Sequence, residues 1–412
     1  MARIAYLLDH EEGHLLPTFK LAHQLRERGH SVFYLGPEDS AELVGREGFD
    51  FVPVLRQIFP AGTMQRLRAA RTGASGAADA PDEESYFEMF MGALARGEGV
   101  DEPVREVRPD LFIIHSFLGL NALVMDYRYG VPVVLLCPLL RSVSRAQSLK
   151  ALQDMLFRMR NGASDFFDLA RRKNPSARTL GDLTARLLRM RELVQCPAEF
   201  DLPRKAEIDP ELFHIEASVH LDRRDDRGFP WERLDPGRKL LYVSLGSQSH
   251  LAGRETALRF LRSVAEGAAR RPEWQLVLGT GGMVEPADLP LPPDAVALPW
   301  IPQIPVLERA ALMVTHGGLG TIKECIFHDV PMVVFPISRD QPENARRVVH
   351  HGLGVRGELA AATPDAVFEA VERVDREPSF RESVARMGAR FREVEASGIG
   401  VQRIEEVLAR RR

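Results

Sequence analysis

The sequence predicts an α/β protein with two Rossmann-like domains, each built on a parallel sheet. Three observations lead to this class. Short apolar runs alternate with amphipathic helical stretches along most of the chain, the order expected of a parallel sheet covered by helices on both faces. This alternation starts twice, at Ile4 and again at Lys239. The 412 residues are also enough for two domains that each bury a core.

The first half of the chain carries the elements of one such domain, which we place at residues 1–221. The expected helix at 15–28 places Leu15, Phe19, Ala22 and Leu25 on one face. A second helix is expected near 118–129, between two buried strands. The expected strands are residues 4–8, 31–35, 111–114 and 131–136.

Two stretches of this half depart from the alternation. Residues 141–200 are helical in pattern, rich in Arg and Met, and without an obvious strand, so we expect helices that roof a binding cleft. Residues 56–85 include a run of low apolar content and predict a mobile loop.

The second series of strands and helices predicts a C-terminal Rossmann-like domain at residues 239–390. Its expected strands are 239–247, 274–278, 310–314 and 332–335. A charged, turn-rich stretch precedes it, and we interpret residues 222–238 as the interdomain linker. Residues 391–412 are expected to form a C-terminal helix that is able to pack back on the N-terminal domain.

Composition excludes several classes of protein. The formal net charge is −4, which gives no electrostatic reason to expect a nucleic-acid partner. The three cysteines, Cys137, Cys196 and Cys325, suit neither a zinc site nor a disulfide framework. The N-terminal apolar run is too short for a signal peptide, and no window approaches a membrane span. We therefore expect a cytoplasmic enzyme without an integral membrane segment.

The most informative segment is residues 300–341. Within it, the glycine-rich turn at 315–321 follows an apolar run and precedes a helical stretch. Free backbone N–H groups at a helix N-terminus bind anions, and a pyrophosphate is the natural occupant. Glu324 lies one turn into that helix and is suited to accept two hydrogen bonds from a ribose diol.

This segment closely resembles the signature of the family 1 nucleotide-sugar-dependent glycosyltransferases. The resemblance implies the GT-B fold, in which two Rossmann-like domains with parallel sheets face each other across a cleft. It also implies that Trp300 stacks on a pyrimidine, that Gln303 and Glu324 contact the ribose, and that His316 contacts the diphosphate. Plant members usually carry Asn-Ser where this chain has Gly320-Thr321, a substitution that we associate with bacterial members. The predicted donor residues are Gly246, Ser247, Trp300, Ile301, Gln303, His316, Gly317, Gly318, Gly320, Thr321, Glu324, Asp340 and Gln341, of which Ser247 is the expected second diphosphate contact and Asp340-Gln341 the sugar-hydroxyl pair.

Three of these residues also have a structural interpretation. Trp300 would then be an interdomain core aromatic, His316 a histidine at a strand end, and Ser247 part of a plain turn. On the acceptor side, the aromatic and Met residues of 86–91 and 157–167 suit an adaptable apolar ligand but suit a helix core equally well.

His14 is the predicted general base. An acceptor hydroxyl must lose its proton as it attacks the sugar, which calls for a base with a pKa near the working pH. His14 lies in the segment Gly13-His14-Leu15-Leu16-Pro17, in the turn after the first strand, where open α/β sheets bind ligands. Family 1 enzymes resemble this chain in carrying a catalytic His there. The structural alternative is a histidine that caps the helix.

His115 occupies the position where many family members carry an Asp that orients the catalytic His. The context reads Pro109-Asp110 and then an apolar run up to His115. A neutral imidazole cannot stabilise a developing imidazolium as a carboxylate does. Three explanations stay open. His115 joins the site in another role, Asp9 or Glu12 orients His14, or the acceptor is acidic enough to need little help.

The resemblance implies an inverting transfer of a sugar from a UDP or dTDP donor to a hydroxyl of a lipophilic small molecule, such as a natural-product aglycone. Backbone amides, the helix dipole, His316 and Ser247 would stabilise the leaving diphosphate, so no metal or other cofactor is expected. The expected state is a monomer or homodimer. The alternatives are a noncatalytic GT-B homologue that activates a partner enzyme and a UDP-sugar epimerase of the same fold.

Overall fold

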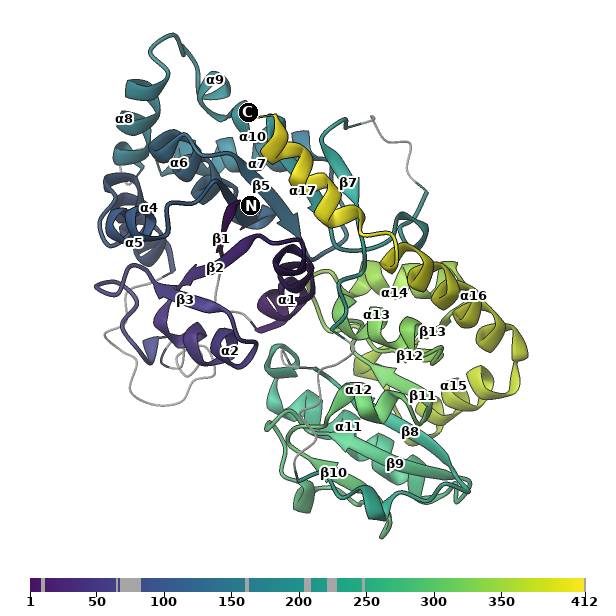
Figure 1. Ribbon diagram of the computed structural model, residues 1–412. Coiled ribbons are helices and arrows are strands. Elements are labelled where there is room, and N and C mark those ends of the chain that lie inside the picture. Colours follow the sequence, from purple (N-terminus) through teal and green to yellow (C-terminus); the bar gives the residue numbers. More distant parts are fainter. Residues whose placement is uncertain are drawn as a thin grey trace. The chain divides into compact units, whose positions relative to one another are not determined.

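The structure is a computed structural model that describes residues 1–8, 12–63, 66, 83–159, 163–203, 209–220, 228–246 and 249–410. The chain divides into two compact units. The N-terminal unit comprises residues 1–195, 205–218 and 398–412, and the C-terminal unit comprises 196–204 and 219–397. Figure 1 shows that each unit contains its own sheet with helices around it.

Over the described residues, the sheet of the N-terminal unit has seven parallel strands in the order β3-β2-β1-β4-β5-β6-β7. The strands are β1 (Arg3–Leu7), β2 (Ser31–Gly36), β3 (Asp50–Pro53), β4 (Leu111–His115), β5 (Val133–Cys137), β6 (Arg191–Val194) and β7 (Leu212–His214). The order reverses between β1 and β4, so this is the topological switch point where open α/β sheets bind ligands.

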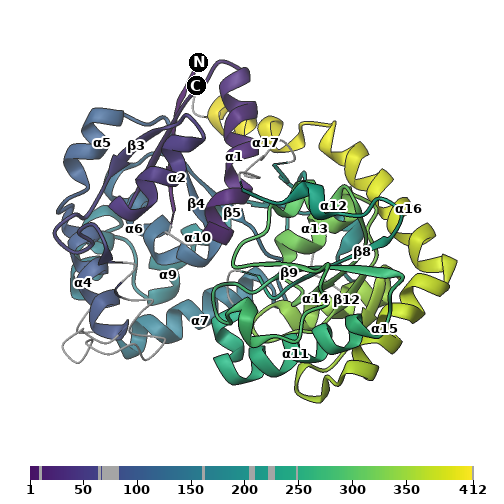
Figure 2. The same cartoon turned by 90° about the horizontal axis from the view of Figure 1, so that it is seen from below.

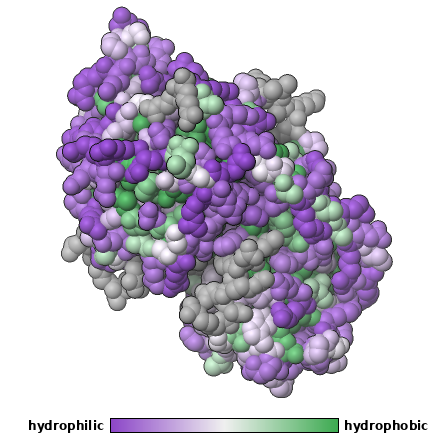
Figure 3. Space-filling view, in the orientation of Figure 1, coloured by the Kyte–Doolittle hydropathy of each residue, from purple (hydrophilic) through white to green (hydrophobic). Residues whose placement is uncertain are grey.

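Helices cover both faces of this sheet because its strands are apolar on both sides. One core packs β1, β4 and β5 against α4, α5, α6 and α8, and the other packs the opposite face against α1 and α17. The helices are α1 (Glu12–Glu27), α2 (Ala41–Arg46), α4 (Glu83–Arg96), α5 (Asp101–Val107), α6 (Gly119–Tyr129), α7 (Arg145–Arg158), α8 (Ser164–Lys173), α9 (Leu180–Thr184), α10 (Arg186–Arg189) and α17 (Ile399–Ala409). On the face of the molecule drawn in Figure 3, hydrophilic side chains dominate and hydrophobic ones gather over part of the N-terminal unit.

The last helix of the chain completes the N-terminal unit. Figures 1 and 2 both show α17 beside α1. The buried Glu216 carboxylate accepts the backbone N–H of Gly400 at 3.1 and 2.9 Å, which meets the positive end of the helix dipole. A Cβ at position 400 would lie 2.7 Å from that carboxylate, so the contact requires glycine.

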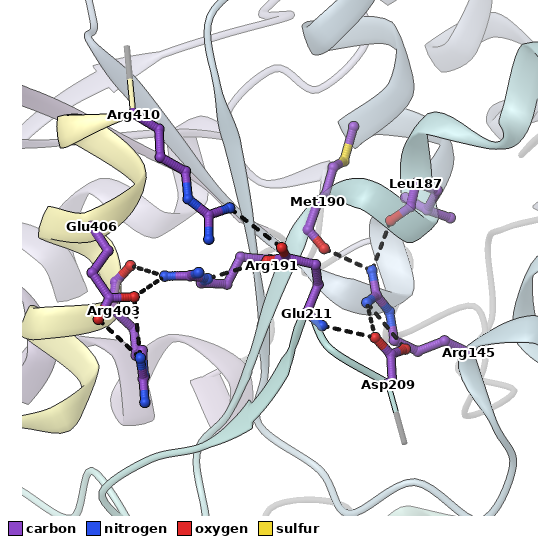
Figure 4. A network of polar contacts seen from close by, with 9 residues as sticks. All are labelled: Arg145, Leu187, Met190, Arg191, Asp209, Glu211, Arg403, Glu406 and Arg410. Carbon is purple, nitrogen blue, oxygen red and sulfur yellow. Dashed lines mark hydrogen bonds and ion pairs between the residues drawn. The ribbon is translucent and has the colours of Figure 1, made fainter. Parts of the chain in front are cut away.

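Buried charges join α17 to the sheet (Figure 4). Arg191 on β6 is only 3% exposed, and it donates to the Glu406 carboxylate at 2.6 Å and to the Arg403 carbonyl at 2.9 Å. On the neighbouring residue, Glu192, which is fully buried, the carboxylate pairs with Arg141 at 2.6 Å and Arg145 at 3.0 Å. Burying a charge is favourable only when it has a well-placed partner, and both Arg191 and Glu192 have such partners.

Over the described residues, the sheet of the C-terminal unit has six parallel strands in the order β10-β9-β8-β11-β12-β13. The strands are β8 (Lys239–Ser244), β9 (Trp274–Gly279), β10 (Val296–Leu298), β11 (Ala310–Thr315), β12 (Met332–Val334) and β13 (Gly354–Arg356). The helices are α11 (Arg254–Ala269), α12 (Gln303–Leu307), α13 (Leu319–Phe327), α14 (Gln341–His350), α15 (Pro364–Arg376) and α16 (Pro378–Glu395). Figure 2 shows α11 and α15 on one side of the sheet and α12 and α13 on the other. The switch point here lies between β8 and β11.

The structure differs from several expected boundaries. The stretch expected to lack a strand contains β6, because its charged residues are neutralised by partners distant in sequence. Residues 228–238 of the expected linker pack on the C-terminal unit, where Arg233 donates to the Ala295 carbonyl at 2.8 Å and the Asp235 N–H donates to Gln275 at 2.8 Å. The expected terminal helix 391–412 is interrupted, since α16 ends at Glu395 and Gly398, in a left-handed conformation, precedes α17. Residues 67–82 of the expected loop and 222–227 of the expected linker lie outside the described residues.

In the described part of the chain, no helix combines the length and apolar character that crossing a membrane requires.

Replacing Glu216 should loosen α17. We expect Glu216→Ala to lower the free energy of opening of this helix by about 2 kcal/mol, since a buried hydrogen bond to a charged group is lost. Native-state hydrogen exchange of the α17 amides is the suitable measurement, because all three tryptophans lie in the C-terminal unit. The matched control is Glu405→Ala on the same helix, which removes a more exposed contact with Arg28 at 3.0 Å and should cost less than about 1 kcal/mol. Equal effects of the two variants would contradict the assigned role of Glu216.

Candidate nucleotide-sugar site and candidate base

His316 is packed between two glycines in the C-terminal unit. It directly follows β11 and is 7% exposed. Because β8 and β11 pair with Ser244 opposite Thr315, the turn after β8 lies beside it. A Cβ would lie 2.3 Å from the His316 ring at position 246 and 2.6 Å from it at position 318. Both contacts are closer than a Cβ tolerates, so the ring holds its place only with glycine on both sides.

The glycine-rich turn presents backbone N–H groups at the start of α13. Gly318 is the N-cap residue and has no side chain with which to cap the helix. Thr315 Oγ1 accepts the Gly317 N–H at 3.3 Å and lies 3.4 Å from His316 Nδ1. Gly317 has φ +86°, which glycine adopts without strain. A helix N-terminus of this kind attracts an anion through its N–H groups and its dipole.

A hydrogen-bonded set holds the predicted ribose carboxylate. Glu324 is 9% exposed, on α13. Gln303, the first residue of α12, donates through Nε2 to the Glu324 carboxylate and to Thr321 Oγ1 at 3.3 Å, and its Oε1 accepts from the Tyr242 hydroxyl at 3.1 Å. The predicted residues Gln303, Thr321 and Glu324 are therefore brought together, and Tyr242 joins them.

Trp300 and Ile301 have opposite exposures. The Trp300 side chain is 54% exposed, which leaves its ring accessible to a planar ligand. Ile301 is 4% exposed, and a Cβ on Gly279 would lie 3.4 Å from it. The Ile301 side chain therefore belongs to the core of this unit. Gly320, in the first turn of α13, has open space around the position of a Cβ.

The predicted sugar-binding pair has divided roles. The half-buried Asp340 is the N-cap residue of α14, and its Oδ2 accepts from the Asn344 amide at 2.7 Å. Gln341 is 3% exposed, and its Oε1 accepts the N–H groups of Ile337 and Ser338 at 2.8 and 3.0 Å. The side-chain amide oxygen of Gln341 thus stabilises the turn before α14, whereas Asp340 is the more accessible of the two.

In the N-terminal unit, the predicted base lies at the switch point. His14 is half-buried near the start of α1. Its ring centroid lies 5.6 Å from that of the fully buried His115, at the end of β4, with the rings nearly perpendicular. Phe117 was not singled out from the sequence. Its ring centroid lies 4.7 Å from that of His14, and its side chain is 45% exposed. One signal in the sequence could have found Phe117, because it is the first large apolar residue after a strand that ends at the binding edge.

Three predicted residues cannot be placed. Ser247 and Asp9 lie outside the described residues, as does the side chain of Glu12. Across the described part of the chain, no group of three or more His, Cys, Asp or Glu side chains is arranged to hold a metal ion.

Burial lowers the pKa of His316 from its ordinary value to about 4, because desolvation disfavours the imidazolium. In the ligand-free protein the ring is therefore neutral at neutral pH. A neutral imidazole carries one N–H group and can therefore donate one hydrogen bond to an anion. Its unprotonated nitrogen cannot donate.

The two glycines beside His316 should be essential to the binding of a nucleoside diphosphate. We expect Gly246→Ala to weaken the affinity for UDP or dTDP at least about tenfold, which is the loss of roughly one good hydrogen bond. Titration calorimetry would measure this. Gly45→Ala on α2, outside the predicted donor site, is the control, because its Cβ enters open space, and its dissociation constant should be close to that of the unchanged protein. A Gly246→Ala variant that binds as well as Gly45→Ala would contradict the packing argument.

The buried His316 should make the C-terminal unit lose stability in acid. The pKa of His316 is lower in the folded than in the unfolded chain, so the neutral ring stabilises the fold above about pH 6.5. As the pH falls towards about 4, the free energy of unfolding should decrease by up to about 3 kcal/mol. We expect His316→Gln to flatten this dependence, as measured by urea unfolding of the ligand-free protein with tryptophan fluorescence. The exposed His350→Gln is the control, and a His316→Gln variant with the acid dependence of this control would contradict the prediction.

Comparison with known proteins agrees with this arrangement. The family model described as UDP-glucoronosyl and UDP-glucosyl transferase matches residues 230–394. The oleandomycin glycosyltransferase of Streptomyces antibioticus is 27% identical, over 94% of this chain and 86% of the relative.

Solved structures resemble the whole chain. The glycosyltransferase of kitacinnamycin has a TM-score of 0.76 at 28% identity and covers 99% of both chains. The spinosyn rhamnosyltransferase SpnG, solved with thymidine diphosphate, has a TM-score of 0.64 at 16% identity and covers 95% of this chain and 96% of its own. Two parallel-sheet α/β units and these neighbours identify the GT-B fold. With the family match over residues 230–394 and these relatives along the whole chain, the protein is a glycosyltransferase that resembles the family 1 nucleotide-sugar-dependent enzymes.

Proposed function

We propose that this glycosyltransferase moves a sugar from a UDP or dTDP donor to a hydroxyl of a lipophilic natural-product acceptor, with inversion at the anomeric carbon. The observation that carries most weight is the assembly of the donor residues around the N-terminus of α13. There, His316 is packed between glycines, and Gln303 holds Glu324. The product names of the relatives support an acceptor of the antibiotic type, and the thymidine diphosphate in a structural neighbour supports dTDP as one donor nucleotide.

The donor would bind with its base on Trp300, its ribose on Glu324 and its diphosphate at the start of α13. The exposed indole offers a flat apolar surface, and aromatic faces stack on bases without reading their sequence. The Glu324 carboxylate, fixed by Gln303, is a suitable acceptor for ribose hydroxyls. Asp340 would accept a hydroxyl of the sugar.

In this mechanism, the acceptor oxygen attacks the anomeric carbon as the bond from that carbon to the diphosphate oxygen breaks. His14 takes the hydroxyl proton, and the nucleoside diphosphate leaves with the electron pair of the broken bond. The negative charge that develops on the diphosphate would be stabilised by the N–H groups of the glycine-rich turn, the dipole of α13 and the neutral His316. The proposal includes no bound metal, and transfer in the presence of EDTA tests that part.

The acceptor surface would include Phe117. Its ring is exposed and contacts His14, so a planar or aromatic acceptor stacked on it would present a hydroxyl close to the base. Aromatic pairs of this kind contribute about 1 kcal/mol beyond the burial of their area. His115 contacts both rings and would set their positions.

Replacing the base should separate transfer from donor binding. We expect His14→Ala to lower the rate of transfer about 10²- to 10⁴-fold, the usual contribution of a general base, and to leave the affinity for UDP or dTDP unchanged. The measurement is product formation from UDP-glucose or dTDP-glucose with a panel of phenolic and polyketide acceptors. His23→Ala, on the same helix with its ring against Phe49, is the control and should retain activity. Transfer by His14→Ala within threefold of the unchanged enzyme would exclude His14 as the base.

The alternatives of an activator without activity and of an epimerase are tested in the same assay. Turnover by the purified chain alone excludes the first, and a sugar recovered on the acceptor excludes the second.

A further inference from the structure

Behind the donor turn lies a series of hydrogen-bonded polar side chains. It runs from Asp201, near the middle of the sequence, to the carboxylate of Asp340, which is predicted to bind the sugar. Its members are Asp201, Arg347, Asn344 and Asp340, all in the C-terminal unit. Arg347 is 1% exposed and Asn344 is fully buried, both on α14. Neither residue belongs to residues 300–341, the segment from which most of the donor residues were predicted.

Asn344 connects two parts of the donor site. Its Nδ2 donates to the Gly317 carbonyl at 3.0 Å and to Asp340 Oδ2 at 2.7 Å. A side-chain amide has two N–H groups, so both are used. Its Oδ1 lies 3.5 Å from Nη1 of Arg347. The Arg347 cation beside Oδ1 and the two acceptors beside Nδ2 together fix the orientation of the Asn344 amide.

Arg347 is in turn held by Asp201. Its Nε and Nη2 lie 2.9 and 2.8 Å from Asp201 Oδ1. Asp201 comes from residues 196–204, which pack on α14 and α16. In that segment the Phe200 carbonyl lies 3.1 Å from His351 Nε2, and Glu199 pairs with Arg390 at 2.6 Å. The guanidinium therefore cannot turn away without leaving a buried charge uncompensated, which is costly.

We propose that Asn344, oriented by Arg347 and Asp201, is a positioning residue that fixes the Asp340 carboxylate for the donor sugar and ties it to the diphosphate turn at Gly317. This inference rests on the proposed function, in which Asp340 accepts a sugar hydroxyl. By accepting from Asn344 on Oδ2, the carboxylate is held in one plane, so its other oxygen accepts in one direction. Sugar and diphosphate are then recognised at a fixed separation, as transfer requires.

The test compares how the protein binds a nucleotide with and without its sugar. The readout is the ratio of the dissociation constants for UDP and UDP-glucose, or for dTDP and dTDP-glucose, measured by calorimetry. An effect on the diphosphate turn alone changes both constants and cancels in this ratio. We expect Asn344→Leu, which keeps the branching at Cγ but cannot donate, to lower the ratio about tenfold, because the charged hydrogen bond that orients Asp340 is lost.

A double-mutant cycle separates positioning from a merely structural role. In the background of Asp340→Ala, Asn344→Leu should lower the ratio no further, because the group it positions is gone. Arg346→Ala is the control on the same helix, since this residue is exposed and pairs only at the surface with Glu343 at 3.0 Å, and it should leave the ratio unchanged.

If Asn344→Leu does not fold, Arg347→Lys replaces it in the cycle, because lysine keeps the charge beside Asp201 but lacks the planar fork that reaches Asn344. We expect a loss of about threefold that likewise disappears in the Asp340→Ala background. Equal losses in both backgrounds, or an unchanged ratio, would overturn the inference while leaving the proposed function intact. A protein that binds neither nucleotide, or whose ratio is insensitive to Asp340→Ala, would instead overturn the proposed donor site and the inference with it.

Discussion

The pairing of parallel strands at the two switch points is the constraint on which both candidate sites depend. In the C-terminal unit, Thr315 lies opposite Ser244, so the chain leaves β8 and β11 side by side and Gly246 meets His316. In the N-terminal unit, Leu7 of β1 lies opposite Ile114 of β4, so His14 and His115 approach each other in the same way. Where the connections that follow two adjacent strands run in opposite directions, an opening is left at the carboxyl ends of those strands. Each site is built from the first residues after two such strands.

Preorganisation of the anion site follows from this pairing. Because the imidazole of His316 fills the space between Gly246 and Gly318, the two turns cannot shift independently. Burial also keeps the ring neutral, so His316 itself brings no positive charge to the turn that would need a counterion. An anion then meets donors that are already in place, and little reorganisation accompanies its binding or the growth of charge on a leaving group. The chain from Asp201 to Asp340 extends the same rigidity to the sugar side.

Much of this was predictable because the signals are local. The first strands of both series are apolar runs, and the turn at 315–321 combines glycines with the start of a helix, so fold and donor turn follow from short stretches of sequence. Asn344 was also within reach, since it lies one helical turn beyond Asp340.

The parts that were not predictable depend on residues far apart in sequence. Strand β6 begins with Arg191 and Glu192, whose charges argue against a buried strand unless their partners are known. These partners are Arg141, Arg145 on α7, Glu211 and Glu406 on α17. Strands of three or four residues, such as β7, β10 and β13, are too short for a periodicity. Residues 196–203 belong to the C-terminal unit, and ion pairs of Asp201 and Glu199 with α14 and α16 join them to it. No local pattern encodes these contacts.

The histidine at position 115 has a chemical consequence for the acceptor. In the proposed mechanism His14 becomes an imidazolium when it takes the proton, and a carboxylate beside it would favour that charge, whereas a neighbouring neutral imidazole would do so much less. His115 is also fully buried, where a second positive charge is disfavoured by desolvation. The less charge His14 must accept in the transition state, the smaller this disadvantage becomes. A phenolic hydroxyl, with a pKa of about 10, gives up its proton far more readily than an aliphatic alcohol. The exposed ring of Phe117 beside His14 suits an acceptor whose hydroxyl is carried on an aromatic ring, so that the shape of the acceptor surface and the strength of the base favour the same class of molecule.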